Sequence, residues 1–362
     1  MMNSELLLKE LINASTESAI DKLLAALPVV DHEKYNIDYG GKINGTWENG
    51  KLHWIPVGGR RGNSGPIKLA GNPINPIAER VVNGTEALIE LYRLRELAQD
   101  PNAPMPSNPR EAALRYFGLP RLDSVPHIAD KEESARIRDL RNKVRKMLFV
   151  QLMYDKTAKE FAIAIHDSGM GQEPARIHET LLSLGETDKA HKPYLIGIFG
   201  QGGSSAFAAS TYSVILSRRA KDLVRPKGDD GIGWTIVRQF FPKGRRDNYF
   251  AYLAASPTGA VPRIEGTAAD HLGFNQGSTF THIRYDFSTT SSAIARTMYQ
   301  ALNHVLFNPI LPYDLFTLEK ERPELMQGTA QRLAQRAIQL SKNRAIGRQS
   351  IIDKSFAPQP VG

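Results

Sequence analysis

The segment Ala162-Ile163-Ala164-Ile165-His166-Asp167-Ser168-Gly169-Met170-Gly171 decides the interpretation of this sequence. An apolar run typical of a β-strand ends in an acidic residue, and glycines follow at the second and fourth positions after it. Asp and Gly are common in turns that terminate strands, so a plain turn is one interpretation. The other is a carboxylate that accepts a hydrogen bond from a ligand, with glycines that let the ligand approach the backbone. The segment by itself leaves both open.

A second segment, Ala78-Glu79-Arg80-Val81-Val82-Asn83-Gly84-Thr85-Glu86-Ala87, falls in a helix expected over residues 76–98. Glu79, Asn83 and Glu86 share one face of that helix because they are four and three residues apart. A solvated acidic face is one interpretation of this spacing. The other is a carboxylate that activates water, one helical turn from an amide oxygen that binds Mg²⁺.

A third segment, Ile196-Gly197-Ile198-Phe199-Gly200-Gln201-Gly202-Gly203-Ser204-Ser205-Ala206-Phe207, is rich in glycine. The N–H groups of such a loop can face an anion, and the helix of small residues expected after it adds the positive end of its dipole. The sequence contains no G-x-x-x-x-G-K-[ST], which excludes a P-loop enzyme. A dinucleotide-binding loop is disfavoured because Ser205 stands where the third glycine is required.

These three segments resemble the motifs of the GHKL superfamily of ATPases, and they occur in the order of that family. The superfamily includes gyrase, heat-shock chaperones of the ninety-kilodalton class, histidine kinases and MutL. Asp167-Ser168-Gly169-Met170-Gly171 resembles the D-x-G-x-G box. The other matches are the N-box E-x-x-x-N-x-x-D-A at Glu79, Asn83 and Glu86-Ala87, with Glu86 in place of the usual Asp, and the lid box G-x-x-G-x-G at Gly197, Gly200 and Gly202.

The resemblance spans about residues 72–285, and further stretches of sequence indicate which members of the superfamily are most similar. Ser183-Leu184-Gly185-Glu186-Thr187-Asp188-Lys189 is similar to the S-x-G-x-[ST]-x-K stretch of MORC-type ATPases. The continuation of the lid box to Ser205-Ala206-Phe207 is similar to the chaperone version. Gly277-Ser278-Thr279, at the start of an expected strand, resembles the Gly-Thr element that closes the adenine pocket. The chaperone-like and MORC-like members are therefore the nearest.

The order of expected elements points to an α+β protein, because helices accompany a run of mostly hairpin-linked strands. The resemblance implies the more specific Bergerat fold, a two-layer α/β sandwich in which helices cover a mostly antiparallel, mixed sheet. We expect helices over 4–27, 76–98, 131–147, 173–184, 291–306 and 329–345, and strands over 52–57, 148–154, 160–166, 212–219, 233–241, 248–255 and 278–285.

The chain is expected to divide into three segments. Residues 1–71 form an N-terminal helix and a Gly/Asn-rich leader, 72–290 form the GHKL ATP-binding domain, and 291–362 form C-terminal helices and a basic tail. The ATP-binding domain carries an insertion at 99–146. Six prolines within 100–126 predict a surface excursion there.

The resemblance implies a role for each matching residue. Glu79 would orient or deprotonate the attacking water, and Asn83 would be the Mg²⁺ ligand. Asp167 would accept a hydrogen bond from the adenine amino group, and Thr279 would support Asp167 and a bound water. Glycines would keep the adenine wall open and surround the phosphates as the lid closes. The expected nucleotide contacts are Asn83, Glu86, Asp167, Gly169, Gly171, Lys189, Gly200, Gln201, Gly202, Gly203, Ser204 and Thr279.

The function implied by the resemblance is Mg²⁺-dependent binding and slow hydrolysis of ATP, with ADP as product. Closure of the lid would gate homodimerisation or contacts with a protein or nucleic-acid partner. The alternative is a nucleotide-sensing module that binds ATP within a larger complex and does not hydrolyse it. Many such ATPases take a Lys or Arg from a following domain, for which residues 291–362 are too few. That cation is expected from another subunit or a partner.

Composition sets the wider limits. Hydrophobic residues make up 41% and charged residues 23% of the 362 residues, which excludes wholesale disorder. The absence of cysteine excludes disulfides, thiolate metal sites and a Cys nucleophile. No apolar run is long enough for a membrane span, and the N-terminus lacks the features of a signal peptide. We therefore expect a cytoplasmic protein with no membrane contact.

The net charge of +8 is concentrated in two segments. Residues 131–146 hold seven basic and three acidic residues, and residues 323–362 hold six basic and two acidic residues. Each segment therefore carries +4, and the rest of the chain is neutral. Solvated helix surfaces are one interpretation of the basic segments 131–146 and 323–354, and contact with a nucleic-acid backbone or a protein partner is the other.

Overall fold

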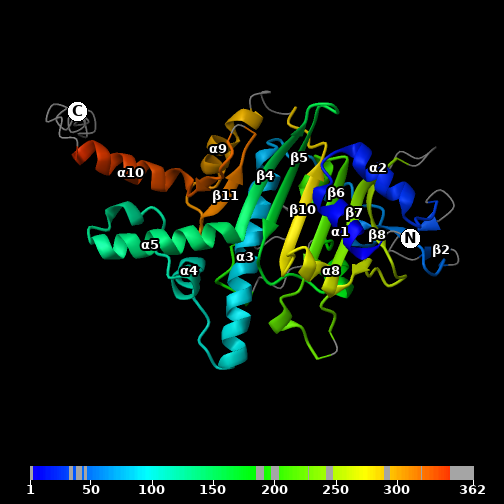
Figure 1. Ribbon diagram of the computed structural model, residues 1–362, viewed down its shortest axis with the longest axis horizontal. Helices are drawn as coiled ribbons and strands as arrows, with labels where there is room; N and C mark the ends of the chain where they lie inside the picture. Colours follow the sequence, from blue (N-terminus) through cyan, green and yellow to red (C-terminus); the bar gives the residue numbers. More distant parts are fainter. Residues whose placement is uncertain are drawn as a thin grey trace, which may run out of the picture.

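The strand that ends at Asp167 lies within a ten-stranded sheet (Figure 1). It is β5, Glu160–Asp167, and it forms a hairpin with β4, Leu148–Asp155, as the sequence predicts. The computed structural model describes residues 3–31, 36–37, 43–44, 47–184, 191–196, 204–226, 228–241, 248–288, 294–318 and 320–342.

The sheet is mixed but mostly antiparallel, which confirms the α+β class. Its order is β12-β11-β4-β5-β10-β6-β7-β8-β3, with β9 paired to β7. Every pair is antiparallel except β11 with β4. The remaining strands of this sheet are β3 His53–Pro56, β6 Tyr212–Arg218, β7 Ile232–Phe240, β8 Tyr249–Ala254, β9 Arg263–Ile264, β10 Gly277–Ile283, β11 Tyr313–Phe316 and β12 Glu324–Met326. β1 Asn36–Ile37 and β2 Ile43–Asn44 pair separately.

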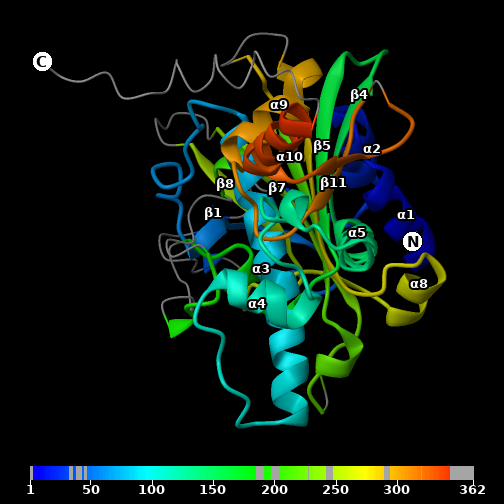
Figure 2. The ribbon, with the colours of Figure 1, turned by 90° about the vertical axis from the view of Figure 1, so that its left-hand side faces the viewer.

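One face of the sheet is covered by α3, Ile74–Gln99, the helix that carries the N-box residues. Its apolar side packs on β4 and β5 in a core that includes Ile77, Leu88, Val150 and Ile165. Helices α4, Pro109–Phe117, and α9, Ile294–Val305, pack against α3 in the same layer. Figure 2 shows α3 on one side of the sheet and helices α1 and α2 on the other. The principal arrangement is the expected two-layer α/β sandwich.

Helices α1, Ser4–Asn13, and α2, Glu17–Ala26, cover part of the second face, together with α8, Gly266–His271. A single helix over 4–27 is expected from the sequence, and this expectation is wrong. The Thr16 hydroxyl accepts a hydrogen bond from the Ala19 N–H at 3.3 Å and caps a second helix. The chain therefore turns at Ala14.

The N-terminal and C-terminal segments both contribute strands to the sheet. β3 forms one edge, and β11 and β12 form the other. The expectation of helices alone after residue 291 missed this pair, because both strands are short and one follows Pro312 directly. The other described elements are α5 Lys131–Val144, α6 Ile177–Thr180, α7 Ser205–Ala208, α10 Gly328–Lys342 and 3-10 turns at Val57–Gly59, Val125–His127, Arg145–Met147, Pro174–Arg176 and Lys221–Leu223.

The insertion at 99–146 is part of the packed structure. Phe117 in α4 and Ile137 in α5 are buried in the same core as α3. The expected surface excursion over 100–126 therefore contains a helix with a buried side. Over the described ranges, no helix combines the length and apolar character that crossing a membrane requires.

Candidate functional site

A cavity of about 630 Å³ lies between α3, the end of β5 and the start of β10. This volume is within the usual range for small-molecule sites. Motif residues from distant parts of the chain meet in its wall. The lining residues are Arg80, Asn83, Gly84, Glu86, Ala87, Glu90, Asp167, Met170, Gly171, Gln172, Arg176, Glu179, Thr180, Leu181, Ser183, Lys192, Leu195, Ser204, Ser278 and Phe280.

Asp167 lies at the end of β5 and is buried in this wall. Its Oδ1 accepts a hydrogen bond from the Gly169 N–H at 2.9 Å. Burial raises the pKa of Asp167 to about 7, although the backbone N–H groups of Gly169 and Ser278 act in the opposite direction. The structure therefore places a carboxyl group that titrates near neutral pH in the cavity wall.

Glycine at two positions brings α3 close to this carboxyl group. A Cβ atom on Gly84 would lie 2.7 Å from Leu148 Cδ1 and 3.2 Å from Asp167 Cβ. A Cβ atom on Gly169 would lie 2.6 Å from the Ala87 Cβ, and the Met170 N–H donates to the Ala87 carbonyl at 3.1 Å. Gly169 therefore serves helix packing in this structure and is not among the cavity-lining residues. Gly84, which the sequence analysis did not select, sets the approach of Asn83 and Glu86 to Asp167.

Two acidic residues of α3 hold the segment that precedes the glycine-rich loop. Glu86 is buried, and its Oε1 accepts a hydrogen bond from the Ile196 N–H at 2.6 Å. Glu90 Oε2 lies 2.9 Å from Lys192 Nζ. Both carboxylates line the cavity, and both are engaged with the chain. Glu86 thus holds the segment at Ile196, and the nucleotide contact expected for it stays a prediction.

Arg80 is a buried cation in the same wall and was not selected from the sequence. Its Cζ lies 3.9 Å from the centroid of the Phe280 ring and 5.5 Å from that of Phe207. Its Nε has no hydrogen-bond partner within the described parts of the chain. Burial lowers the pKa of Arg80 to about 10, so the side chain is still charged at neutral pH. The sequence pattern around Arg80 did not indicate burial, because arginine beside Glu79 is typical of a solvent-exposed helix face.

Gly171 shapes the far wall of the cavity through a close backbone approach. It has a φ of +58°, and a Cβ atom there would overlap the carbonyl oxygen of Arg218. The Ala220 N–H donates to the Met170 carbonyl at 2.9 Å, so the turn after Asp167 is fastened to the end of β6. Gly171 lines the cavity, and its expected role beside adenine stays a prediction.

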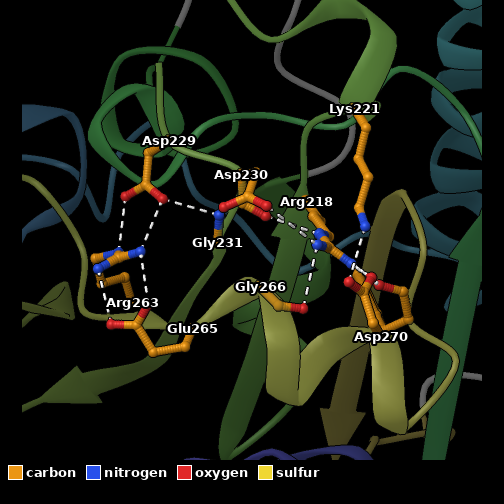
Figure 3. Close-up of polar contacts among 10 residues, drawn as sticks. Arg218, Lys221, Asp229, Asp230, Gly231, Arg263, Glu265, Gly266 and Asp270 are labelled. Atoms are coloured by element: carbon orange, nitrogen blue, oxygen red, sulfur yellow. Dashed lines mark hydrogen bonds and ion pairs between the residues drawn. The ribbon is translucent and has the colours of Figure 1, made fainter. Parts of the chain in front are cut away.

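Arg218, which buttresses Gly171, is the centre of a buried polar network (Figure 3). Its guanidinium donates to the carbonyl oxygens of Asp230, Gly266 and Phe274 over 2.7–3.2 Å. It also donates to Asp270 Oδ1 at 2.7 Å, and Lys221 Nζ lies 2.8 Å from the other oxygen of that carboxylate. The network joins β6 to α8 and to the loop that precedes β7.

Thr279 does not support Asp167, contrary to expectation. In the register of β10 with β5, Ser278 lies opposite Asp167 and Thr279 lies opposite His166. Side chains alternate between the faces of a strand, so Thr279 points to the other face of the sheet. Its Oγ1 lies 2.8 Å from His166 Nδ1, in a separate cavity of about 530 Å³. Ser278 and Phe280 lie on the opposite face of β10 from Thr279 and line the candidate site instead.

The remaining expected site residues either make weaker contact with the cavity or lie outside the described ranges. Glu79 lies one helical turn before Asn83 and is half-buried, but it does not line the cavity. Ser204 lines the cavity, and the helix after it, α7, has only four residues. A helix of this length contributes only a small dipole at its N-terminus, in contrast to the expectation. Lys189, Gly200, Gln201, Gly202 and Gly203 lie outside the described residues.

The described residues contain no cluster of three or more His, Asp or Glu side chains that could hold a metal ion. Asn83 in the cavity wall offers one amide oxygen. Mg²⁺ commonly keeps several waters and uses only one or two protein ligands when a phosphate supplies the rest. A Mg²⁺ ion with Asn83 as its protein ligand would therefore need a phosphate and waters to complete its coordination.

The structure brings helix α5 and helix α10, which hold described parts of the two basic segments, to the same end of the molecule (Figure 1). Helix α5 lies beside the start of α10, where Arg141 donates to Gln327 Oε1 at 2.6 Å. Arg145 pairs with Asp314 of β11. Exposed bases remain on both helices, at Lys131, Arg138, Lys143, Arg332 and Arg336.

No model of a known protein family matches this chain, and no curated protein matches it.

Proposed function

We propose that the cavity binds ATP together with Mg²⁺, in the manner of the GHKL ATPases whose motifs the sequence resembles. The observation that carries this proposal is the meeting of Asp167 and Asn83 in one cavity wall. These residues lie 84 positions apart in the sequence and belong to two different motifs. A strand-ending turn and a solvated helix face would have no reason to share a buried cavity.

The base would lie at the Asp167 end of the cavity. A carboxylate can accept a hydrogen bond from the amino group of adenine, and Ser278 lies opposite Asp167 in the neighbouring strand. Gly171 presents backbone without a side chain beside this position. Recognition of the base would therefore come from one buried acceptor and a close-fitting backbone wall.

The phosphates would extend along α3 toward Asn83 and Ser204. Asn83 would hold the Mg²⁺ ion, which supplies charge neutralisation for the phosphate oxygens when it is bound. Glu79, one turn from Asn83, would act as the general base for slow hydrolysis to ADP. The chemistry requires positioning and neutralisation more than covalent catalysis by the protein.

A nucleotide-sensing module that binds ATP without turnover is the second candidate. The position of Glu79 favours it, because this carboxylate is outside the cavity lining. A base that does not reach the attacking water cannot accelerate its reaction. Closure of the glycine-rich loop or a partner's contact would have to complete the site in the enzymatic version.

The substitution Glu79→Ala separates the two candidates. For an enzyme, the variant should bind MgATP with wild-type affinity and lose phosphate release by at least about 100-fold, as expected for loss of a general base. The measurement is steady-state phosphate release beside equilibrium ATP binding. Because the basic helices α5 and α10 are adjacent, turnover should be measured with and without duplex DNA over a salt series.

The wild-type result decides the enzymatic part of the proposal. Phosphate release that stays at background with and without DNA, while ATP binds, would leave the sensing module as the function. Release that is unchanged in Glu79→Ala would show that Glu79 is not the base.

A further inference from the structure

The guanidinium of Arg80 is the feature of the cavity that the sequence motifs do not explain. The side chain is only 6% exposed, yet it lines the cavity. Its Cζ sits over the ring of Phe280 at 3.9 Å, which holds the planar group in one orientation through a cation–π contact. The cation is therefore fixed in place beside open space.

Arg80 has no anionic partner in the described protein. Its Nε makes no hydrogen bond, and no ion pair joins Arg80 to a carboxylate among these residues. The acidic side chains that line the same cavity contact other groups: Glu86 accepts from the Ile196 N–H and Asp167 from the Gly169 N–H, while Glu90 Oε2 pairs with Lys192 and Glu179 with Arg176. A buried charge without a partner is costly, so a ligand anion is the natural complement.

The groups behind Arg80 cannot neutralise it either. His282 is fully buried, and burial together with the nearby Arg80 charge holds the pKa of this histidine well below its ordinary value. His282 Nδ1 lies 2.8 Å from the Ser213 hydroxyl, which carries no charge. Glu79 is adjacent in sequence and favours the charged form of Arg80, but it forms no ion pair with it in the described structure. Arg80 therefore lines the cavity without a carboxylate in hydrogen-bond or ion-pair contact among the described residues.

Arg80 also lies at a suitable distance from the expected base site. It precedes Gly84, the α3 residue that approaches the Asp167 side chain, by four residues, and it precedes Ala87 by seven, which corresponds to about 6 Å and about 10 Å along the helix axis. Ala87 holds the turn beside Asp167 through its carbonyl oxygen. Asn83, the expected Mg²⁺ ligand, lies one turn closer to that end. An extended nucleotide with its base at Asp167 would bring its phosphates to Asn83 and Arg80.

We infer that Arg80 binds the phosphate chain of the nucleotide and supplies, from within this domain, the cation that such a site needs. The inference rests on the proposed function. A planar guanidinium can donate two hydrogen bonds to one phosphate, which gives direction as well as charge. The role assigned is binding and positioning of the phosphates.

The test compares Arg80→Met with wild type for binding of MgATP, MgADP and adenosine by titration calorimetry. Arg80→Met should weaken MgATP binding by about 10- to 100-fold, the usual range for loss of a charged hydrogen bond. Adenosine, which has no phosphate, should bind both proteins equally. Arg80→Lys should recover part of the loss, because it keeps the charge and loses the paired geometry.

Arg238→Met is the matched control. Arg238 is also stacked on aromatic side chains, with its Cζ 4.8 Å from the Phe240 ring centroid and 5.3 Å from that of Tyr212, but it does not line the cavity. Its variant should keep wild-type affinity for MgATP. Thermal unfolding without ligand should show Arg80→Met to be as stable as wild type or more stable, since no ion pair is lost and the apolar Met side chain can still pack on the Phe280 ring.

The outcomes separate this inference from the proposed function. No ATP binding by the wild type would refute the proposed function. Wild-type MgATP affinity in Arg80→Met would overturn only the role of Arg80. An equal loss of ATP and adenosine binding in that variant would also overturn it, because Arg80 would then shape the cavity without recognising phosphate.

Discussion

Arg218 and Arg80 are both buried arginines beside the same sheet, but their surroundings differ. The guanidinium of Arg218 donates to three backbone carbonyls and to the carboxylate of Asp270 (Figure 3). The guanidinium of Arg80 rests on the ring of Phe280 and faces the candidate site, where its Nε has no partner in the described chain. One charge is satisfied by the protein, and the other is not.

The difference distinguishes a buried charge that stabilises the fold, at Arg218, from a buried charge that is available to a ligand, at Arg80. Hydrogen bonds to several carbonyls offset the desolvation of Arg218, so its network can hold β6, α8 and the loop before β7 together. In the cavity, desolvation is not offset in this way, because burial lowers the pKa of Arg80 and raises the pKa of Asp167. Both shifts show that burial disfavours the charged forms there. A ligand that pairs with these charges would recover the cost.

The largest effect on stability is expected for Arg218→Met. The substitution removes the Arg218 donor from three backbone carbonyls and from Asp270 Oδ1, and leaves Asp270 paired with Lys221 alone. Breaking a buried charge network in this way should lower the free energy of unfolding by about 3–5 kcal/mol. Denaturant unfolding followed by circular dichroism measures it.

Arg263→Met provides the control for Arg218→Met. Arg263 pairs with Asp229 and Glu265 in the neighbouring network, but it is 44% exposed. Surface ion pairs contribute about 0–1 kcal/mol, so this variant should be close to wild type. Similar losses in both variants would remove the distinction drawn for Arg218.

A smaller effect, with a characteristic pH dependence, is expected for Asp167→Asn. Burial raises the pKa of Asp167 to about 7 in the folded state, so the folded protein binds this proton more tightly than the unfolded chain does. The stability of wild type should therefore fall as pH rises from about 4 to about 7, and the full penalty should persist above that range. This pKa shift corresponds to a destabilisation of wild type by about 4 kcal/mol at high pH. Asp167→Asn removes this destabilisation, but it also weakens the hydrogen bond that the Ser278 N–H donates to the side chain, so the net gain is smaller.

The net expectation is that Asp167→Asn is about 2 kcal/mol more stable than wild type at pH 8, with the advantage disappearing near pH 4. Unfolding curves of both proteins between pH 4 and pH 8 provide the measurement. A stability difference that does not change with pH would show that this carboxyl group is not destabilised by burial.

The sequence predicted the central sheet well, because its strands are apolar runs bounded by polar turns. The hairpin of β4 and β5 and the four strands β6, β7, β8 and β10 lie where they were expected. The edge strands β11 and β12 were missed. They have four and three residues, and β11 pairs with β4 across more than 150 residues of chain, so local pattern contains little information about them.

Several residues of the candidate site could be predicted from the sequence, but the contacts between them could not. The motif spacing identified Asp167 and Asn83, which the structure brings to one cavity. It did not distinguish Ser278 from Thr279, because the choice depends on which face of β10 meets α3. The burial of Arg80 depends on Phe207 and Phe280, which are more than 100 residues away along the chain. Such long-range packing cannot be read from a helical pattern.

The most direct test of the account is a calorimetric titration of wild-type protein and of Asp167→Asn with MgATP at pH 8. Asp167 is ionised at this pH and can accept the hydrogen bond from adenine. Wild type should bind one ATP per chain in a saturable manner, and the variant should remain folded and lose that binding. Equal binding of MgATP by the two proteins, or no binding by wild type, would contradict the assignment of this cavity as a nucleotide site.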